Sequence, residues 1–192
     1  MTNYVHQGDL PDDLDLGPVV AIDSETMRLR LGRDPLCVVQ LRRPDYDCPN
    51  LKRILRDRAV LKLFHFGRFD IAMFALHLGV TTAPVYCTKI ASKLARTYTD
   101  RHGLKDVTRE LLGIDISKAQ QSSDWGAARL SDDQIAYAAS DVLNLHALRT
   151  KLDAMLEREG RSELAAACFE FLPTRARLDI AGWEDNDIFA HS

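Results

Sequence analysis

The sequence has no uninterrupted apolar run of the roughly 18 residues that a membrane-spanning helix needs. Residues 1–17 are polar and acidic, and they lack the basic and then apolar layout of a signal peptide. No Cys-x-x-Cys pair is present, so the spacing favours neither a zinc site nor a disulfide framework. We therefore expect a cytoplasmic protein with no membrane partner and with reduced thiols. Its four cysteines are Cys37, Cys48, Cys87 and Cys168.

A strong net charge is also missing. The 192 residues carry a formal charge of −3, so the protein as a whole is not one of the strongly basic proteins that bind long duplexes through many phosphates. A locally basic groove is still compatible with this charge. The hydrophobic share of 46% is typical of a globular protein that buries a full core. Repeats and low-complexity linkers are absent as well. We predict one domain over residues 1–172, with its core at about 18–152, and a tail over residues 173–192.

The chain begins with strand patterns and continues mainly with helix patterns. Two β-rich runs are separated by a Gly and an Asp-Pro, so we expect them to pair as a hairpin, and a third strand follows. This order predicts an α/β layer in which helices cover a small mixed sheet. The predicted strands are 18–23, 36–42 and 61–66, and the predicted helices are 50–57, 69–78, 88–98, 104–112, 131–156 (opened by a capping box at Ser131) and 162–172, which stops at Pro173.

Two carboxylates end the first strand. Asp23 and Glu25 are two positions apart, so their side chains share a face of an extended chain. Two like charges 4 Å apart repel by about 4 kcal/mol at an effective dielectric near 20. Such a pair is tolerated if a cation lies between the carboxylates, if they share a proton, or if they are solvated at a polar strand end.

Three further polar residues follow in a fixed order. Asp70 comes directly after the strand 61–66, where it can be an ordinary first-turn helix residue favoured by the helix dipole. Tyr137 and Asp141 are four apart and share one face of a helix, where they can form a polar edge. Each of the three segments alone is common in proteins, whereas all three in this order are not.

The set resembles the motifs of the DEDD superfamily of 3′–5′ exonucleases, in the tyrosine-containing branch of ribonuclease D. The resemblance covers residues 18–152 and is strongest to the short NrnC-type nano-RNases. The ending of this sequence, DIFAHS, also looks like that of these enzymes. It implies a ribonuclease H-like mixed five-stranded sheet flanked by helices. The second motif, HFGRFD, departs from many relatives by opening with His65 in place of Asn. Asp23 and Glu25 match the first motif, Asp70 the second, and Tyr137 with Asp141 the third.

The resemblance implies metal-dependent phosphodiester hydrolysis. Carboxylate oxygens suit two divalent cations, Mg²⁺ or Mn²⁺, which together activate water and stabilise the leaving oxygen. Asp23, Glu25 and Asp141 would hold the first ion, and Asp23 with Asp70 the second. Tyr137 would orient the attacking water, because an ordinary tyrosine pKa near 10 makes it a poor base at neutral pH.

Substrate contacts after the first motif are also expected. Thr26 and Met27 follow the carboxylates and can meet the terminal nucleotide. Leu29 either wedges between two bases, as the resemblance implies, or simply packs.

A second group of candidate substrate contacts lies around the second motif and before the third. His65, Phe66 and Arg68 are beside Asp70 in the sequence. Phe66 can stack on a base or belong to the core. Arg68 or Lys118 can bind a phosphate or be solvated, and Trp125 can contact substrate or pack.

The last residues and the substrate complete the prediction. The tail after Pro173 carries five large apolar residues, so it must dock on its own domain or on a neighbour. The resemblance implies a homo-oligomer, with an octamer as one candidate size. We predict hydrolysis of short oligoribonucleotides, dinucleotides included, to nucleoside 5′-monophosphates. The alternatives are an exonuclease on longer RNA or on DNA, a two-metal phosphohydrolase acting on a nucleotide, and a catalytically silent nucleic-acid-binding domain.

Overall fold

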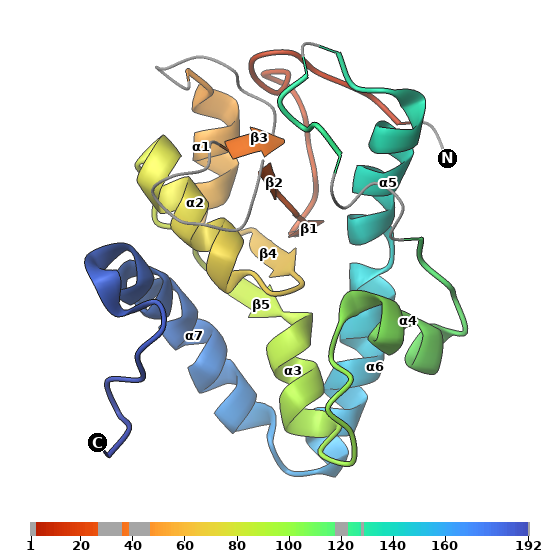
Figure 1. Cartoon of the computed structure of the whole chain (residues 1–192), viewed down its shortest axis with the longest axis vertical. Coiled ribbons are helices and arrows are strands. Elements are labelled where there is room, and N and C mark those ends of the chain that lie inside the picture. The colour runs from red at the N-terminus through yellow and green to blue at the C-terminus, as the bar shows by residue number, and fades with distance from the viewer. Residues whose placement is uncertain (1–2, 27–35, 39–46, 118–122, 128, 192) are drawn as a thin grey trace.

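The computed structural model describes residues 3–26, 36–38, 47–117, 123–127 and 129–191. At its centre is a parallel sheet of three strands in the order β1-β4-β5 (Figure 1). These strands are β1 (Val19–Ala21), β4 (Leu61–Phe64) and β5 (Val85–Cys87). Because all three strands run the same way, their carboxyl ends meet at one edge of the sheet.

Side chains that alternate along the strands build a core on each face of this sheet. Phe64 and Val85 pack on one side, and Leu63 and Tyr86 pack on the other. A parallel sheet is stable when helices cover both of its faces, and the core clusters show that arrangement. The first face is covered by α1 (Pro49–Arg56), α2 (Arg68–Leu78) and α7 (Ser162–Leu178), and the second by α3 (Thr88–Ala95), α4 (Leu104–Leu112) and α6 (Leu145–Arg158).

The α/β class and the first four predicted helices are confirmed, except that the third helix ends at Ala95 rather than at residue 98. The predicted hairpin has the wrong partner. Val19–Ala21 pair with β4 rather than with the run 36–42. The run 36–42 contributes β3 (Leu36–Val38), which pairs antiparallel with β2 (Glu25–Thr26). The five strands of the described residues are therefore divided between a three-stranded parallel sheet and a separate two-stranded one.

Helix α5 (Asp132–Leu143) opens as predicted, with a capping box. The backbone N–H of Gln134 donates to Ser131 Oγ over 3.2 Å, and Ser131 N–H donates to Gln134 Oε1 over 2.9 Å. The single helix predicted over 131–156 is wrong, because α5 ends at Leu143 and α6 begins at Leu145. This break leaves Leu143 49% exposed and buries Leu145, so the two helices present different faces to the core.

Helix α7 does not stop at Pro173, as the sequence predicted, but continues to Leu178. Proline removes one hydrogen bond from the helix interior. The turn beyond it is held by the burial of Ala176 and by the ion pair of Arg175 with Asp179. A π-helical turn, η1 (Asp179–Trp183), follows directly. Within the described residues, no helix combines the length and apolarity that crossing a membrane requires.

Candidate active site

The topology brings the first and second motifs together. Asp23 follows the end of β1, and Asp70 lies in the first turn of α2, which begins four residues after β4 ends. Since β1 and β4 are parallel neighbours, both carboxylates emerge at the same edge of the sheet. Helix α5 runs beside this edge and supplies Asp141 (Figure 1).

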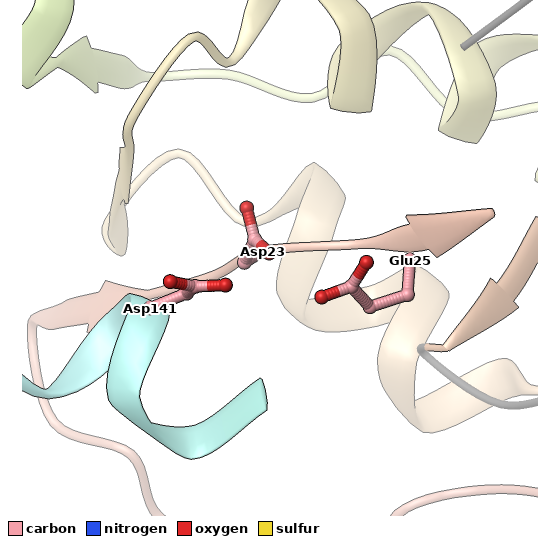
Figure 2. A group of neighbouring side chains, drawn as sticks. All are labelled: Asp23, Glu25 and Asp141. Atoms are coloured by element: carbon pink, nitrogen blue, oxygen red, sulfur yellow. The ribbon is translucent and has the colours of Figure 1, made fainter. Parts of the chain in front are cut away.

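Asp23, Glu25 and Asp141 form a compact carboxylate cluster, which we call the acidic cluster. One oxygen from each residue lies within 4.8 Å of the other two. Figure 2 shows Asp23 on the chain that links β1 to β2 and Glu25 at the start of β2, with Asp141 reaching them from α5. Asp23 lies between β1 and β2 and belongs to neither strand. The two acids still converge, although strand pairing is interrupted between Ala21 and Glu25.

The three carboxylates of the acidic cluster all have raised pKa values, and burial is the largest cause for each. Burial raises the pKa of Glu25 to about 8, and the charges of Asp141 and Asp70 add to this. Burial likewise raises the pKa of Asp141 to about 6. The pKa of Asp23 lies well above its ordinary value because of burial first and its acidic neighbours second. An assembly of buried acids that resists ionisation is stabilised by a cation placed among them.

Asp70 is 4% exposed and is fixed by Ser24, the residue between the two acids of the first motif. The backbone N–H of Ser24 donates to Asp70 Oδ1 over 2.9 Å, and its hydroxyl donates to the same oxygen over 2.6 Å. Burial raises the pKa of Asp70 to about 6, and the bonds from Ser24 oppose that rise. The sequence prediction missed Ser24, whose only signal was a hydroxyl side chain between two acids.

Tyr137 lies at the acidic cluster with its ring against Trp125. The two ring centroids are 5.9 Å apart, and Trp125 is 1% exposed, so it forms a buried support for the tyrosine. Burial raises the pKa of Tyr137 further above its ordinary value, and the charges of Asp141, Glu25 and Asp23 act in the same direction. The Tyr137 hydroxyl is therefore protonated at neutral pH and is able to donate a hydrogen bond.

The residues before Asp70 have three different environments. The Nδ1 of His65 lies 2.8 Å from Thr88 Oγ1, and burial lowers the pKa of His65 to about 3, so its ring is neutral. Phe66 is 43% exposed, so its predicted alternative role in the core is wrong. Lys89 Nζ lies 4.2 Å from the centroid of the Phe66 ring. The sequence prediction missed Lys89, because its contact with Phe66 joins two residues that are 23 positions apart.

The remaining candidates are Thr26, Arg68, Met27, Leu29 and Lys118. Thr26 is 8% exposed and lies in β2, next to Glu25. The guanidinium of Arg68 binds the carboxylate of Asp179. Met27, Leu29 and Lys118 lie outside the described residues.

A parallel sheet flanked by helices, with clustered acids and a tyrosine at one edge, defines a class of nuclease domain. The sequence model of the 3′–5′ exonuclease domain matches residues 8–157, and the chain belongs to this family. Ribonuclease D of Granulibacter bethesdensis is 38% identical over 155 residues, which are 75% of this chain and 39% of that protein. Ribonuclease D of Escherichia coli is 30% identical over 179 residues, 88% of this chain and 47% of that one. The chain thus spans less than half the length of these relatives.

Solved structures of NrnC match nearly the whole chain. Brucella melitensis NrnC is 52% identical, with a TM-score of 0.93 over 97% of both chains. The same protein bound to pGG is 51% identical, with a TM-score of 0.90 over 97% of both chains. With bound Mg²⁺ it is 51% identical, with a TM-score of 0.92 over 97% of this chain and 98% of that one.

Proposed function

We propose that this chain is a 3′–5′ exoribonuclease that hydrolyses short oligoribonucleotides, dinucleotides included, to nucleoside 5′-monophosphates with two divalent cations. The observation that carries the proposal is the acidic cluster, whose three carboxylates come within 4.8 Å of one another at the edge of the sheet. The similar NrnC structures with pGG, a short RNA, and with Mg²⁺ support the choice of substrate and metal.

The donors of the acidic cluster fit Mg²⁺ or Mn²⁺, which prefer carboxylate oxygens. Asp23, Glu25 and Asp141 would hold the first ion, and Asp70, beside Asp23, would contribute to the second. When bound, such ions lower the pKa of an attacking water and stabilise the departing 3′ oxygen.

The chain's own residues then orient the reactants. Tyr137, protonated at neutral pH and supported by Trp125, would donate a hydrogen bond from its hydroxyl to the water or phosphate that it positions. Ser24 holds Asp70 in one rotamer through two hydrogen bonds to one oxygen. Thr26, one of the two residues of β2, would place the terminal nucleotide beside the acids.

The test is a product assay on 5′-labelled RNA and DNA of graded lengths, with Mg²⁺ or Mn²⁺ added. We expect nucleoside 5′-monophosphates from dinucleotides, no turnover in EDTA, and no turnover by the Asp141→Asn variant. Release of free phosphate from a mononucleotide would instead identify a phosphohydrolase. Binding of RNA with no turnover under any metal would identify a silent binding domain.

We also propose a cytoplasmic homo-oligomer. Large apolar side chains are exposed on α7 and beyond it, where Phe171 is 39% and Phe189 74% exposed and their ring centroids lie 6.0 Å apart. Exposed aromatic side chains that lie together in this way favour a partner surface. Light scattering of the wild-type chain and of Phe189→Ser tests this, and a monomeric mass for the wild type would contradict it.

A further inference from the structure

Asp179, the first residue of η1, is a buried acid far from the acidic cluster in sequence. It is 5% exposed and is bound by two arginines. Arg68 Nε donates to Asp179 Oδ2 over 2.5 Å, and Arg68 Nη2 donates to Oδ1 over 2.7 Å. Arg175 Nη1 lies 2.7 Å from the same Oδ1. Asp179 therefore fixes the guanidinium of Arg68 in a two-point geometry.

Arg68 is also bound by the residue that follows η1. Its Nη2 donates to the backbone carbonyl of Glu184 over 2.6 Å. The side chain at the first position of α2 is thus held by two groups of the C-terminal segment, Asp179 and Glu184. Both groups lie outside residues 8–157, the part of the chain that the exonuclease domain model covers.

The turn just before Arg68 is strained. Phe66 has a φ of +70°, a conformation that costs a bulky residue free energy and persists only when its surroundings hold it. Gly67 then serves as the N-cap of α2, with no side-chain cap. A Cβ at Gly67 would lie 2.5 Å from Phe64 Cβ, so the turn is also pressed against β4. Asp70 comes two residues after Arg68 and takes its place from this turn.

We propose that Asp179 and Arg68 are positioning residues, which hold the strained start of α2 so that Asp70 stands in place for the second cation. The proposal rests on the proposed function, because it assigns Asp70 to a metal site. In this arrangement the C-terminal turn is a working part of the nuclease centre. Arg68 acts through the backbone of α2, and its guanidinium is committed to Asp179 and Glu184 rather than to a substrate phosphate.

The test compares Asp179→Asn with the wild-type chain by calorimetric titration with Mn²⁺ at 25 °C and by steady-state kinetics on a dinucleotide. Asparagine keeps the shape of the side chain and removes its charge. We expect one of the two Mn²⁺ binding events to weaken by roughly tenfold, the low end of the loss seen when the support of a metal ligand is removed. In kinetics, kcat should fall while KM stays within twofold, and raised Mn²⁺ should restore part of kcat.

A matched control removes an ion pair elsewhere. Arg158→Gln breaks the exposed pair of Arg158 with Glu159 at the C-terminal end of α6, and we expect unchanged metal binding and kinetics. If Asp179→Asn fails to fold, Arg68→Lys takes its place, since lysine keeps the charge but loses the two-point geometry.

A folded Asp179→Asn or Arg68→Lys variant that melts earlier but binds two Mn²⁺ ions with wild-type affinity would show a merely structural role and overturn the proposal. The Mn²⁺ titration decides this without any turnover. A wild-type chain that binds metal but hydrolyses nothing would refute the proposed function and leave this test intact.

Discussion

Ser24 donates two hydrogen bonds to a single oxygen of Asp70, one from its backbone N–H over 2.9 Å and one from its hydroxyl over 2.6 Å. The two residues are 46 positions apart, so these bonds tie the chain between β1 and β2 to the start of α2. Asp23 and Glu25 flank Ser24, and any shift of this short segment therefore moves three of the four acids together. The hydroxyl bond is the part of this link that a substitution can remove.

Ser24→Ala should lower kcat by about tenfold with little change in KM, because the variant keeps the N–H bond and loses the hydroxyl bond that fixes Asp70. Ser24→Thr keeps the hydroxyl and serves as the control, with activity close to wild type. Mn²⁺ titration should show weaker binding for the alanine variant only. Equal kcat values for Ser24→Ala and the wild-type chain would show that the backbone bond alone positions Asp70.

Tyr137→Phe should lower kcat by roughly 100-fold while KM and metal affinity stay near wild type, the scale expected when a positioned donor is lost. The phenylalanine ring can keep the contact with Trp125, so the fold should be unaffected. Thermal melting checks the fold, and dinucleotide kinetics checks the role. A raised KM with unchanged kcat would make Tyr137 a binding residue instead.

The metal-free protein should lose stability as pH rises from 6.5 to 8. The pKa of Glu25 is raised from 4.5 to about 8, so the folded chain holds a proton that the unfolded chain releases, and stability falls as pH climbs toward the folded value. The pKa of His65 is lowered from 6.5 to about 3 in the folded chain, so His65 makes stability rise with pH, but only below pH 6.5.

Glu25→Gln is the variant that isolates this effect. In EDTA, its melting temperature should exceed that of the wild-type chain at pH 8 and should depend less on pH, because one repelling charge is gone. Added Mg²⁺ should raise the wild-type melting temperature at pH 8 more than that of the variant, which should also have lost turnover. A wild-type melting curve in EDTA that is flat between pH 6.5 and 8 would contradict the raised pKa of Glu25.

The sequence identified the acids because their order is informative even where local structure is misjudged. Asp141 was placed by helical spacing and by the capping box at Ser131, both of which are local signals. Asp23 was expected to end the strand 18–23 with Glu25 two positions further on, but β1 ends at Ala21 and Asp23 lies outside the strands. Their convergence was still predicted, because side chains two positions apart in an extended chain lie on the same side.

What the sequence did not reveal depends on distant partners. Strand β5 has three buried residues with no polar alternation, so nothing in its pattern separates it from a loop or a helix segment. The bond between Arg68 and Asp179 joins residues 111 positions apart, and no local pattern predicts such a pairing. The helix end predicted at Pro173 failed partly for the same reason, since Ala176, beyond the proline, is buried in a core that other elements build.

The last prediction concerns substrate length. We expect kcat/KM to be highest for RNA of two to four nucleotides and to fall for longer strands. The net charge of −3 offers no overall attraction for a long polyanion, and an NrnC structure 51% identical to this chain is bound to pGG. Few phosphates would be neutralised, so the slope of log K against log salt should be shallow, about −0.7 for each phosphate on a single strand.

The measurement is kcat/KM for two-, five- and twenty-nucleotide RNAs and a matched DNA duplex, each over a salt series. A twenty-nucleotide RNA or a duplex degraded faster than the dinucleotide, with a steep salt slope, would overturn the short-substrate prediction and leave the exonuclease proposal standing.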